Sequence, residues 1–382
     1  MERFIYLDNA ATTPLSPVAL AAMQPFLTNY YGNASSQYGL GDISKQAINE
    51  ARSTVANIID CHEDEIYFTS GGTESNNWAL IGIAEANRDK GKHIITSKIE
   101  HPSVINTCKY LESRGYEITY LNVDSDGNIS LEELEESLKE DTILISIMYV
   151  NNEIGTIQNV KQIGDIAKKH NVLFHTDAVQ AVGHTYVDVE SSNIDLLSCS
   201  GHKFGAPKGV GFLYVRCNTP ITSYMHGGHQ EYGMRAGTEN VAGIVGLSAA
   251  LQDAHVHFTE WNTTTQSLRN YLYNGIKDAV PDVVLNGASL KERVSGNLNL
   301  RFPGISNETL STILSVSGIY VSVGSACNSG TKEPSHVLSA IGLSPEEANE
   351  SIRFSINSNN TYEEMDQTID MIRVVVNRLK NN

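Results

Sequence analysis

Short apolar segments alternate with helix-periodic segments over the first two-thirds of the chain. Strand-like runs occur at 65–69, 93–97, 143–150, 172–176 and 209–215, and helix-like segments at 103–115 and 160–170 separate several of them. Parallel strands need such crossover connections, so the alternation predicts βαβ units. We therefore expect an α/β fold with a mainly parallel sheet and helices on both of its faces.

The pattern changes after residue 255. A longer helical stretch covers 255–275, and strand-like runs at 297–302, 319–323 and 351–356 then alternate with helical segments up to a last helix near 361–380. This predicts a second, smaller α/β domain, which a chain of 382 residues is long enough to form. We expect a large domain at 16–258 and a small domain built from 1–15 together with 259–382.

The charge balance narrows the range of partners. Lys and Arg total 27 and Asp and Glu total 44, which gives a formal net charge of -17. This argues against binding to nucleic acid or to an anionic membrane, because both are polyanions. No apolar run reaches the roughly 18–20 residues of a transmembrane helix, and the opening residues lack the features of a signal peptide. We expect a cytoplasmic protein that binds small molecules or proteins.

The cysteines are odd in number and scattered, and no two form a CxxC motif. They are Cys61, Cys108, Cys199, Cys217 and Cys327. Such a set argues against a disulfide framework and against a zinc site. Small and polar residues surround Cys327 in GSACNSGTKEP, as is typical of an exposed loop, whereas the other four lie in apolar or helical contexts. Cys327 is therefore the candidate for a thiol that acts alone as a nucleophile.

Lys203 and Asp177 follow or end predicted strands. Lys203 lies in SCSGHKFGAPKG, on a turn that Pro207 and Gly209 keep from continuing as a helix, and it is either a Schiff-base lysine or a surface cation. Asp177 ends the strand VLFHT at the carboxyl edge of the sheet, where ligands bind in open α/β sheets. There it either holds a pyridine nitrogen protonated or caps a helix. Gln180 is placed to reach the phenolic oxygen of such a ring.

The segment FTSGGTESNN places Gly71, Gly72 and Thr73 between a predicted strand and a predicted helix. Backbone N–H groups at a helix N-terminus, together with the hydroxyl of Thr73, suit a phosphate group. The segment is not a P-loop, because no Lys-Ser/Thr pair follows it, and it is not a GxGxxG motif. It is a candidate anion site of another kind.

His101 lies directly before Pro102 in IEHPSV, at a second predicted strand-to-helix turn. An imidazole at this position either lies against a cofactor ring and moves protons near neutral pH, or has a structural role alone.

Taken together, the ordered segments resemble the cysteine desulfurases, a branch of the class V aminotransferases with the fold type I architecture. They are TSGGTESNN, IEHPSV, VNNEIGT, HTDAVQAVG, SCSGHKFGAPKGVG, GGHQEYGMRAGTEN and GSACNSG. The resemblance runs from Asp8 to Arg353 and thus covers nearly the whole chain. It implies a pyridoxal-phosphate-dependent transferase with a large, mainly parallel α/β domain and a smaller α/β domain that carries Cys327 and Arg353.

The resemblance also implies roles for individual residues. Lys203 would form the Schiff base with pyridoxal 5'-phosphate, His101 would stack on the ring, and Asn152 and Arg353 would bind the substrate, Arg353 through its carboxylate. Thr238 would reach the phosphate from the other subunit of a homodimer. The implied cofactor-binding set is Gly72, Thr73, Asn152, Asp177, Gln180, Ser200, Gly201, His202, Lys203 and Thr238.

The implied reaction converts L-cysteine to L-alanine and transfers the sulfur to Cys327 as a persulfide. Lys203 or His101 would move the α-proton, and the persulfide would pass to an acceptor protein or thiol that the sequence does not identify, in sulfur mobilisation such as iron–sulfur cluster assembly. The chain ends without the C-terminal extension that housekeeping members use to dock a scaffold. Alternatives are a selenocysteine lyase, another class V aminotransferase, or a catalytically silent homologue.

Overall fold

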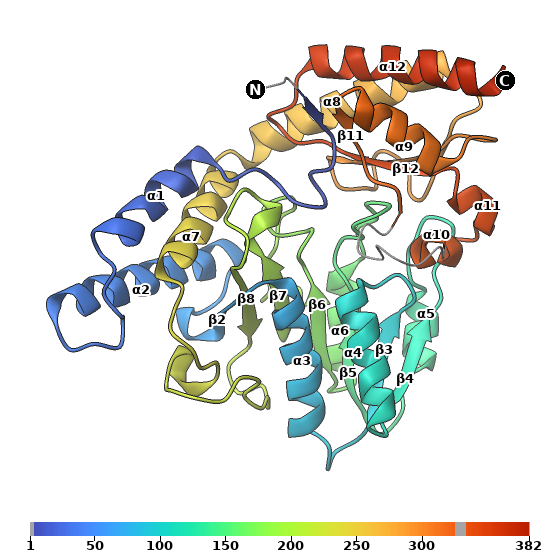
Figure 1. Cartoon of the computed structure of the whole chain (residues 1–382). Helices are drawn as coiled ribbons and strands as arrows, with labels where there is room; N and C mark the ends of the chain where they lie inside the picture. The colour runs from blue at the N-terminus through green and yellow to red at the C-terminus, as the bar shows by residue number, and fades with distance from the viewer. Residues whose placement is uncertain (1–3, 325–333, 382) are drawn as a thin grey trace.

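The computed structural model describes residues 4–324 and 334–381, and its largest element is a seven-stranded sheet with strand order β2-β8-β7-β6-β5-β3-β4 (Figure 1). β8 runs antiparallel to β2 and β7, and the remaining pairings within this sheet are parallel. The expected α/β fold with a mainly parallel sheet is confirmed. The strands are β2 (Ile66–Thr69), β3 (His93–Ser97), β4 (Glu117–Leu121), β5 (Thr142–Ser146), β6 (Leu173–Asp177), β7 (Leu196–Ser200) and β8 (Gly211–Val215).

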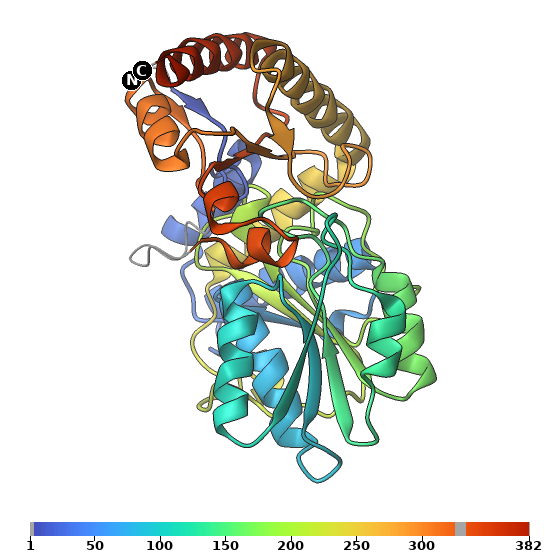
Figure 2. The same ribbon diagram turned by 90° about the vertical axis from the view of Figure 1, so that its right-hand side faces the viewer.

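Helices cover both faces of this sheet (Figures 1 and 2). One face packs against α3 (Gly72–Ala86) and α4 (Pro102–Ser113), and the other against α2 (Gly39–Ile59), α6 (Val160–Lys169) and α7 (Val241–Val256). Successive strand residues point to opposite faces of a sheet. In β5, Leu144 therefore packs in the hydrophobic cluster with α3 and α4, whereas Ile145 packs in the cluster with α2, α6 and α7. Two buried faces explain why the strands read as continuous apolar runs.

A second layer of structure carries its own hydrophobic core. Its three-stranded sheet has the order β12-β10-β9, and β1 pairs in parallel with β11 beside it. Figure 2 shows α8 and α12 along the outside of this layer. The domain boundaries at 16–258 and at 1–15 with 259–382 stay a prediction. The elements are β1 (Ile5–Tyr6), α8 (Phe258–Ala279), β9 (Val284–Leu285), β10 (Asn297–Arg301), α9 (Asn307–Val316), β11 (Ile319–Tyr320), α10 (His336–Ala340), α11 (Pro345–Ala348), β12 (Ser351–Ser355) and α12 (Tyr362–Lys380).

One expected strand is shorter in the structure, and several elements were not expected. The strand expected at 143–150 ends at Ser146, and the chain then leaves the sheet as a loop that crosses its edge. The apolar run continues past the strand because Ile147, Met148 and Val150 are buried in that loop. β4 was not expected, and neither was α1 (Pro17–Thr28) nor α2. Among the described residues, no helix combines the length and the apolar composition that crossing a bilayer requires.

The carboxyl edge of the parallel strands faces the second layer and carries polar residues. β3, β5, β6 and β7 are neighbours in the sheet, so their ends lie side by side. These strands end at Ser97, Ser146, Asp177 and Ser200. The segments that follow them bear His101, Asn152, Gln180 and Lys203. Open α/β sheets bind ligands at this edge.

A buried ion pair fixes the segment that precedes α7. Arg52 donates to both carboxylate oxygens of Glu231 at 2.8 Å and also to the carbonyl of Ile66, and Glu231 accepts from the backbone N–H of Phe68 at 2.9 Å. Both side chains are 5% exposed or less. The pair therefore ties α2 and β2 to the 3-10 turn η3 (Glu231–Gly233), from which the chain runs on toward Thr238.

We expect Arg52→Ala to lower the free energy of unfolding by roughly 3–5 kcal/mol, because it leaves the Glu231 carboxylate buried without a cation. Arg88→Ala is the matched control, since the ion pair of Arg88 with Asp89 is exposed and should contribute less than about 0.5 kcal/mol. Urea unfolding followed by circular dichroism measures both. Equal losses for the two variants would contradict the structural role of the buried pair.

Candidate active site

Lys203 lies one 3-10 turn after β7, at the end of η2 (Gly201–Lys203). Its Nζ donates to the carbonyl of Ala10 at 2.7 Å and to that of Ala11 at 2.8 Å. Gly205 follows with φ of +88°, a conformation that side-chain-bearing residues rarely adopt, and this lets the chain turn back toward β8. The turn thus holds Lys203 half-buried at the edge of the sheet, against the N-terminal segment.

Asp177 is the last residue of β6 and is 5% exposed. Its Oδ2 accepts from Asn76 Nδ2 at 2.7 Å, and its Oδ1 accepts from the backbone N–H of Val179 at 3.0 Å. The chain continues from Asp177 in turns and not as a helix, so Asp177 is not a helix cap. Each oxygen keeps a further lone pair with which the carboxylate can accept from a ligand N–H.

His101 caps the N-terminus of α4. Its Nδ1 accepts from the backbone N–H of Ser103 at 3.1 Å and lies 2.7 Å from Ser103 Oγ. Burial lowers the pKa of the imidazole, Asp177 opposes this, and the neighbouring Lys203 and His336 add to the lowering. His101 is therefore a neutral imidazole at neutral pH.

The predicted phosphate-binding residues come together at the N-terminus of α3. Gly72, Thr73, Ser200 and His202 line a cavity of about 320 Å³. A Cβ on Gly72 would lie 2.6 Å from Val179 Cγ2, so only glycine fits there. The first-turn N–H groups of α3 and its dipole favour an anion in this cavity.

Thr12 and Lys208 also line this cavity, although sequence reasoning did not select them. Lys208 lies in GAPKGVG, five residues after Lys203. Its position on a turn between Pro207 and Gly209 is the sequence feature that could have identified it. Burial, with Lys203 and Lys208 nearby, lowers the pKa of His202 to about 4, so this imidazole is neutral as well. Gly201, which was also predicted, is buried in the turn itself.

Thr238 and Gln180 were predicted to contact the cofactor, Thr238 from the other subunit, and both contacts stay predictions. Thr238 is exposed on the segment between η3 and α7, and it is not among the described residues that line the phosphate cavity. Gln180 Nε2 donates to the carbonyl of Ala10 at 2.9 Å, the same oxygen that accepts from Lys203. The amide nitrogen of Gln180 is thus engaged by the backbone.

A larger cavity of about 480 Å³ opens beside Lys203. Asn152 and Gln180 line it together with Lys203, and it extends toward Trp261 and Asn357 of the second layer. This is the space available to a small substrate next to the lysine.

Arg353 lies on β12 with its side chain 4% exposed, and it contacts Asn152. Its Nη1 donates to the carbonyl of Asn152 at 2.9 Å, and its Nη2 donates to Asp8 Oδ1 at 2.6 Å. Asp8 was not predicted, and it partly neutralises the expected carboxylate clamp. A guanidinium has five N–H groups, so donors remain for a second carboxylate, including Nε, which has no partner among the described residues.

The chain after the undescribed residues 325–333 is held against two site-bearing turns. Ser335 Oγ donates to Glu153 Oε2 at 2.5 Å, and His336 Nε2 donates to the carbonyl of Glu100 at 2.9 Å. Glu153 follows Asn152 and Glu100 precedes His101. Cys327 itself lies outside the described residues.

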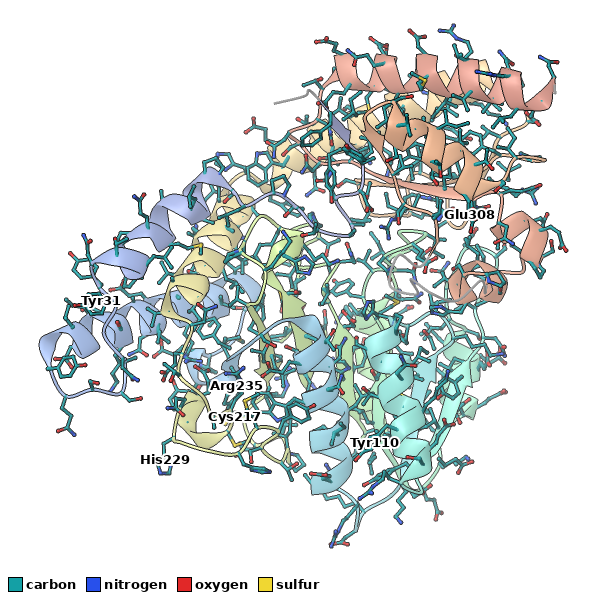
Figure 3. The ribbon with its side chains drawn as sticks, viewed as in Figure 1. Tyr31, Tyr110, Cys217, His229, Arg235 and Glu308 are labelled. Atoms are coloured by element: carbon teal, nitrogen blue, oxygen red, sulfur yellow. The ribbon has the colours of Figure 1, made fainter. Side chains whose placement is uncertain are left out.

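The other cysteines differ in their surroundings. Cys108 and Cys199 are buried and Cys61 is half-buried, and burial raises the pKa of all three thiols. Cys217 is exposed, so its expected apolar or helical context is wrong. It follows the end of β8, which runs antiparallel to β7, and it therefore lies at the sheet edge opposite to Lys203 (Figure 3).

The donor set fits pyridoxal phosphate. The cavity at the N-terminus of α3 suits its phosphate, the carboxylate of Asp177 suits its ring nitrogen, and Lys203 suits its aldehyde. Together with a mainly parallel α/β sheet, these groups are those of a pyridoxal-phosphate-dependent enzyme with the fold type I architecture.

Comparison with known proteins agrees. The family model described as aminotransferase class-V matches residues 5–368. A relative named cysteine desulfurase IscS, from Methanosarcina thermophila, is 51% identical over 99% of this chain and 93% of its own length, and a putative cysteine desulfurase IscS 1 from Bacillus subtilis is 45% identical over 99% and 100%. A solved NifS-like protein superposes with a TM-score of 0.92 at 39% identity, covering 98% of this chain and 100% of that protein. The chain belongs to the cysteine desulfurases of the class V aminotransferase family.

Glu100 is a fully buried carboxyl beside this site. Its Oε1 accepts from Ser97 Oγ at 2.7 Å and from the backbone N–H of Met148 at 2.9 Å, whereas Oε2 has no partner among the described residues. Burial, with Asp177 nearby, raises its pKa from 4.5 to about 8. The folded protein therefore holds a proton that the unfolded chain releases above about pH 4.5.

We expect this group's contribution to stability to fall as the pH rises from about 5 to about 8, by roughly 2–4 kcal/mol, because the folded state binds the extra proton in that interval. Glu100→Gln keeps the accepting oxygen but cannot titrate. As the pH rises through this interval, the unfolding free energy of Glu100→Gln should therefore increase relative to that of the wild type. Glu132→Gln, at an exposed position, controls for the lost charge. Parallel pH dependences of Glu100→Gln and wild type would contradict a proton on Glu100.

Proposed function

We propose that this protein is a pyridoxal-phosphate-dependent cysteine desulfurase that converts L-cysteine to L-alanine and transfers the sulfur to Cys327 as a persulfide. The observation that carries the proposal is the meeting of Lys203, Asp177 and the phosphate cavity at one sheet edge, next to a cavity lined by Lys203 and by Asn152, whose carbonyl accepts from Arg353. A lysine, a carboxylate and an anion site in this arrangement serve amino-acid chemistry.

The described residues divide the work of holding the reactants. When bound, pyridoxal phosphate supplies an aldehyde that joins covalently to amines and a ring that withdraws electrons from the attached amino acid. Gly72, Thr73, Ser200 and His202 would hold its phosphate, and Asp177 would keep a proton on its ring nitrogen. Arg353 would bind the carboxylate of the substrate and so orient it. It would use the guanidinium N–H groups that do not donate to Asp8 or Asn152.

Proton transfer falls to groups at the same edge. Lys203 Nζ would accept the α-proton of the substrate as a neutral amine. The backbone carbonyls of Ala10 and Ala11 accept from Nζ and so hold it in position. Electron withdrawal from the substrate then weakens its bond between Cβ and sulfur.

Sulfur transfer from the substrate to Cys327 needs no oxidant, reductant or other additional reactant. The Cys327 thiolate attacks the substrate sulfur, an S–S bond forms, and the bond between Cβ and sulfur breaks with its electron pair going to the carbon, which is later protonated to give L-alanine. The product on the enzyme is Cys327 carrying one extra sulfur, which an acceptor thiol can take in turn. The solved structure of SspA in complex with cysteine, 37% identical with a TM-score of 0.81, supports cysteine as the substrate.

We expect Cys327→Ala to retain lysine-bound cofactor, seen as visible absorbance, but to lose sulfide release from cysteine in the presence of a thiol by at least about 100-fold, because the nucleophile is gone. Cys217→Ala is the matched control, since it removes an exposed thiol at the opposite sheet edge. Undiminished sulfide release by Cys327→Ala would contradict the persulfide step.

We further propose that the protein is a homodimer in which Thr238 of one subunit completes the phosphate site of the other. Thr238 is exposed and does not line the phosphate cavity of its own described chain. Large apolar side chains are also exposed on α1, on α2 and on the connection between them. They are Val18, Leu20, Leu27, Tyr30, Tyr31 and Ile43, and Figure 3 marks Tyr31. The proposed interface would cover these side chains.

The cytoplasm is the compartment that we propose for this activity. Sulfur acceptance by Cys327 needs a free thiol, and cytosolic reductants keep thiols reduced. The described cysteines are all free, which agrees with a reducing compartment. The sulfur acceptor is a protein or small thiol, with iron–sulfur cluster assembly as one pathway that it would serve.

Subunit complementation tests the shared site. In a co-expressed heterodimer of Lys203→Ala and Thr238→Val subunits, action between subunits leaves one fully intact site, whereas action within a subunit leaves none. We expect Thr238→Val homodimers to bind the cofactor at least about tenfold more weakly, from loss of one hydrogen bond to a charged group. The heterodimer should show one site per dimer with wild-type affinity. Weak sites only, or a monomeric wild type, would contradict the proposal.

A further inference from the structure

A chain of hydrogen bonds links the carboxylate of Asp177 to the imidazole of His101. Asn76, on α3, lies between them with its Nδ2 2.7 Å from Asp177 Oδ2 and 2.8 Å from Ser103 Oγ. Ser103 Oγ lies 2.7 Å from His101 Nδ1. Asn76 is 1% exposed and Ser103 is 9% exposed, so water does not compete strongly for these groups.

The Asp177 carboxylate fixes the directions of the hydrogen bonds as far as Ser103, and the backbone N–H of Ser103 decides the role of His101 Nδ1. A carboxylate only accepts, so Asn76 must present its NH2 group and not its oxygen to Asp177. The second hydrogen of that NH2 group then goes to Ser103 Oγ. At the other end, the backbone N–H of Ser103 can only donate, and it points at His101 Nδ1 from 3.1 Å.

Two donors therefore converge on one nitrogen. The Ser103 hydroxyl, which accepts from Asn76, has its single hydrogen left for His101 Nδ1, and the Ser103 N–H is the second donor. A proton on Nδ1 would break the hydrogen bond from the Ser103 N–H, which can only donate. The neutral imidazole must carry its proton on Nε2, and no hydrogen bond links Nε2 to another described residue.

We propose that Asn76 and Ser103 are positioning residues that fix His101 as the tautomer protonated on Nε2, so that His101 donates a hydrogen bond in the site and does not act as a base. In the reaction proposed above, on which this inference rests, the α-proton then goes to Lys203 alone. The sequence left Lys203 and His101 as equal candidates for that step.

The charged groups around His101 agree with this state. Lys203 on η2 and His336 on α10 lower the pKa of the imidazole together with its burial, and Asp177 on β6 opposes them. A second proton on the ring would have to enter at Nδ1, between two donors. The pKa of His101 is therefore lower than that of an ordinary histidine.

The test is 15N NMR of the full-length holoenzyme labelled on histidine, with His101→Gln used to assign the His101 signals. We expect an unprotonated Nδ1 and a protonated Nε2 in the wild type. Ser103→Ala should show mixed tautomers, and Ser103→Thr, which keeps the hydroxyl, should restore the wild-type pattern. Asn76→Ala should weaken the preference, with Asn77→Ala, at the next position of α3, as its control.

Steady-state kinetics provides the second measurement. We expect Ser103→Ala to lower kcat for cysteine by roughly tenfold with little change in KM. The substrate still binds to this variant, but His101 is then a mixture of two tautomers. A wild-type proton on Nδ1, or a Ser103→Ala tautomer identical to the wild type, would overturn the proposal even if cysteine is converted. A wild type that forms no alanine but keeps the Nε2 proton would overturn the desulfurase function and leave the tautomer assignment standing.

Discussion

The N-terminal segment from Asp8 to Thr13 is the constraint on which the site depends, because it fastens the two layers of the protein together. On one side it meets β12, where Asp8 pairs with Arg353 and the backbone N–H of Ala10 donates to Ser355 Oγ. On the other side it meets the turn after β7, where the carbonyls of Ala10 and Ala11 accept from Lys203. Lys203 and Arg353 are thus held by neighbouring residues of one segment.

The segment from Asp8 to Thr13 also helps to explain how two cations, Lys203 and Arg353, can lie in one site. Asp8 lies against Arg353, and Asp177 ends β6, the strand next to β7, which Lys203 follows, so a carboxylate belongs to each part of the site. The histidines around them add no charge, because burial lowers the pKa of His101, His202 and His175, the last to about 3. The site can therefore take up an anionic phosphate and an anionic substrate carboxylate without excess positive charge.

Sequence reasoning predicted much of the fold and the chain positions of the site, for identifiable physical reasons. Strands buried on both faces leave continuous apolar runs, which located β3, β5, β6 and β8. Asp177 and Lys203 could be selected because strand ends and glycine-rich turns are local features. β4, with half-buried residues such as Tyr120, has a weaker apolar signal, and it was missed.

Contacts between distant segments could not be predicted in the same way. The pairing of Asp8 with Arg353 and of Ser335 with Glu153 joins residues far apart in the chain, and no local pattern records it. The link from Asp177 through Asn76 to His101 is of this kind too, since it depends on how α3 and α4 pack on the sheet. Exposed Cys217 was misjudged because its apolar strand ends two residues before it.

The most direct test of the account is the chemical location of the cofactor. Borohydride reduction of the purified protein traps the bond between a lysine Nζ and pyridoxal phosphate, and mass spectrometry of the digest then identifies the modified peptide. The account predicts the added mass of the reduced cofactor on Lys203. The same mass on another lysine such as Lys208, or no modified peptide after incubation with pyridoxal phosphate, would contradict it.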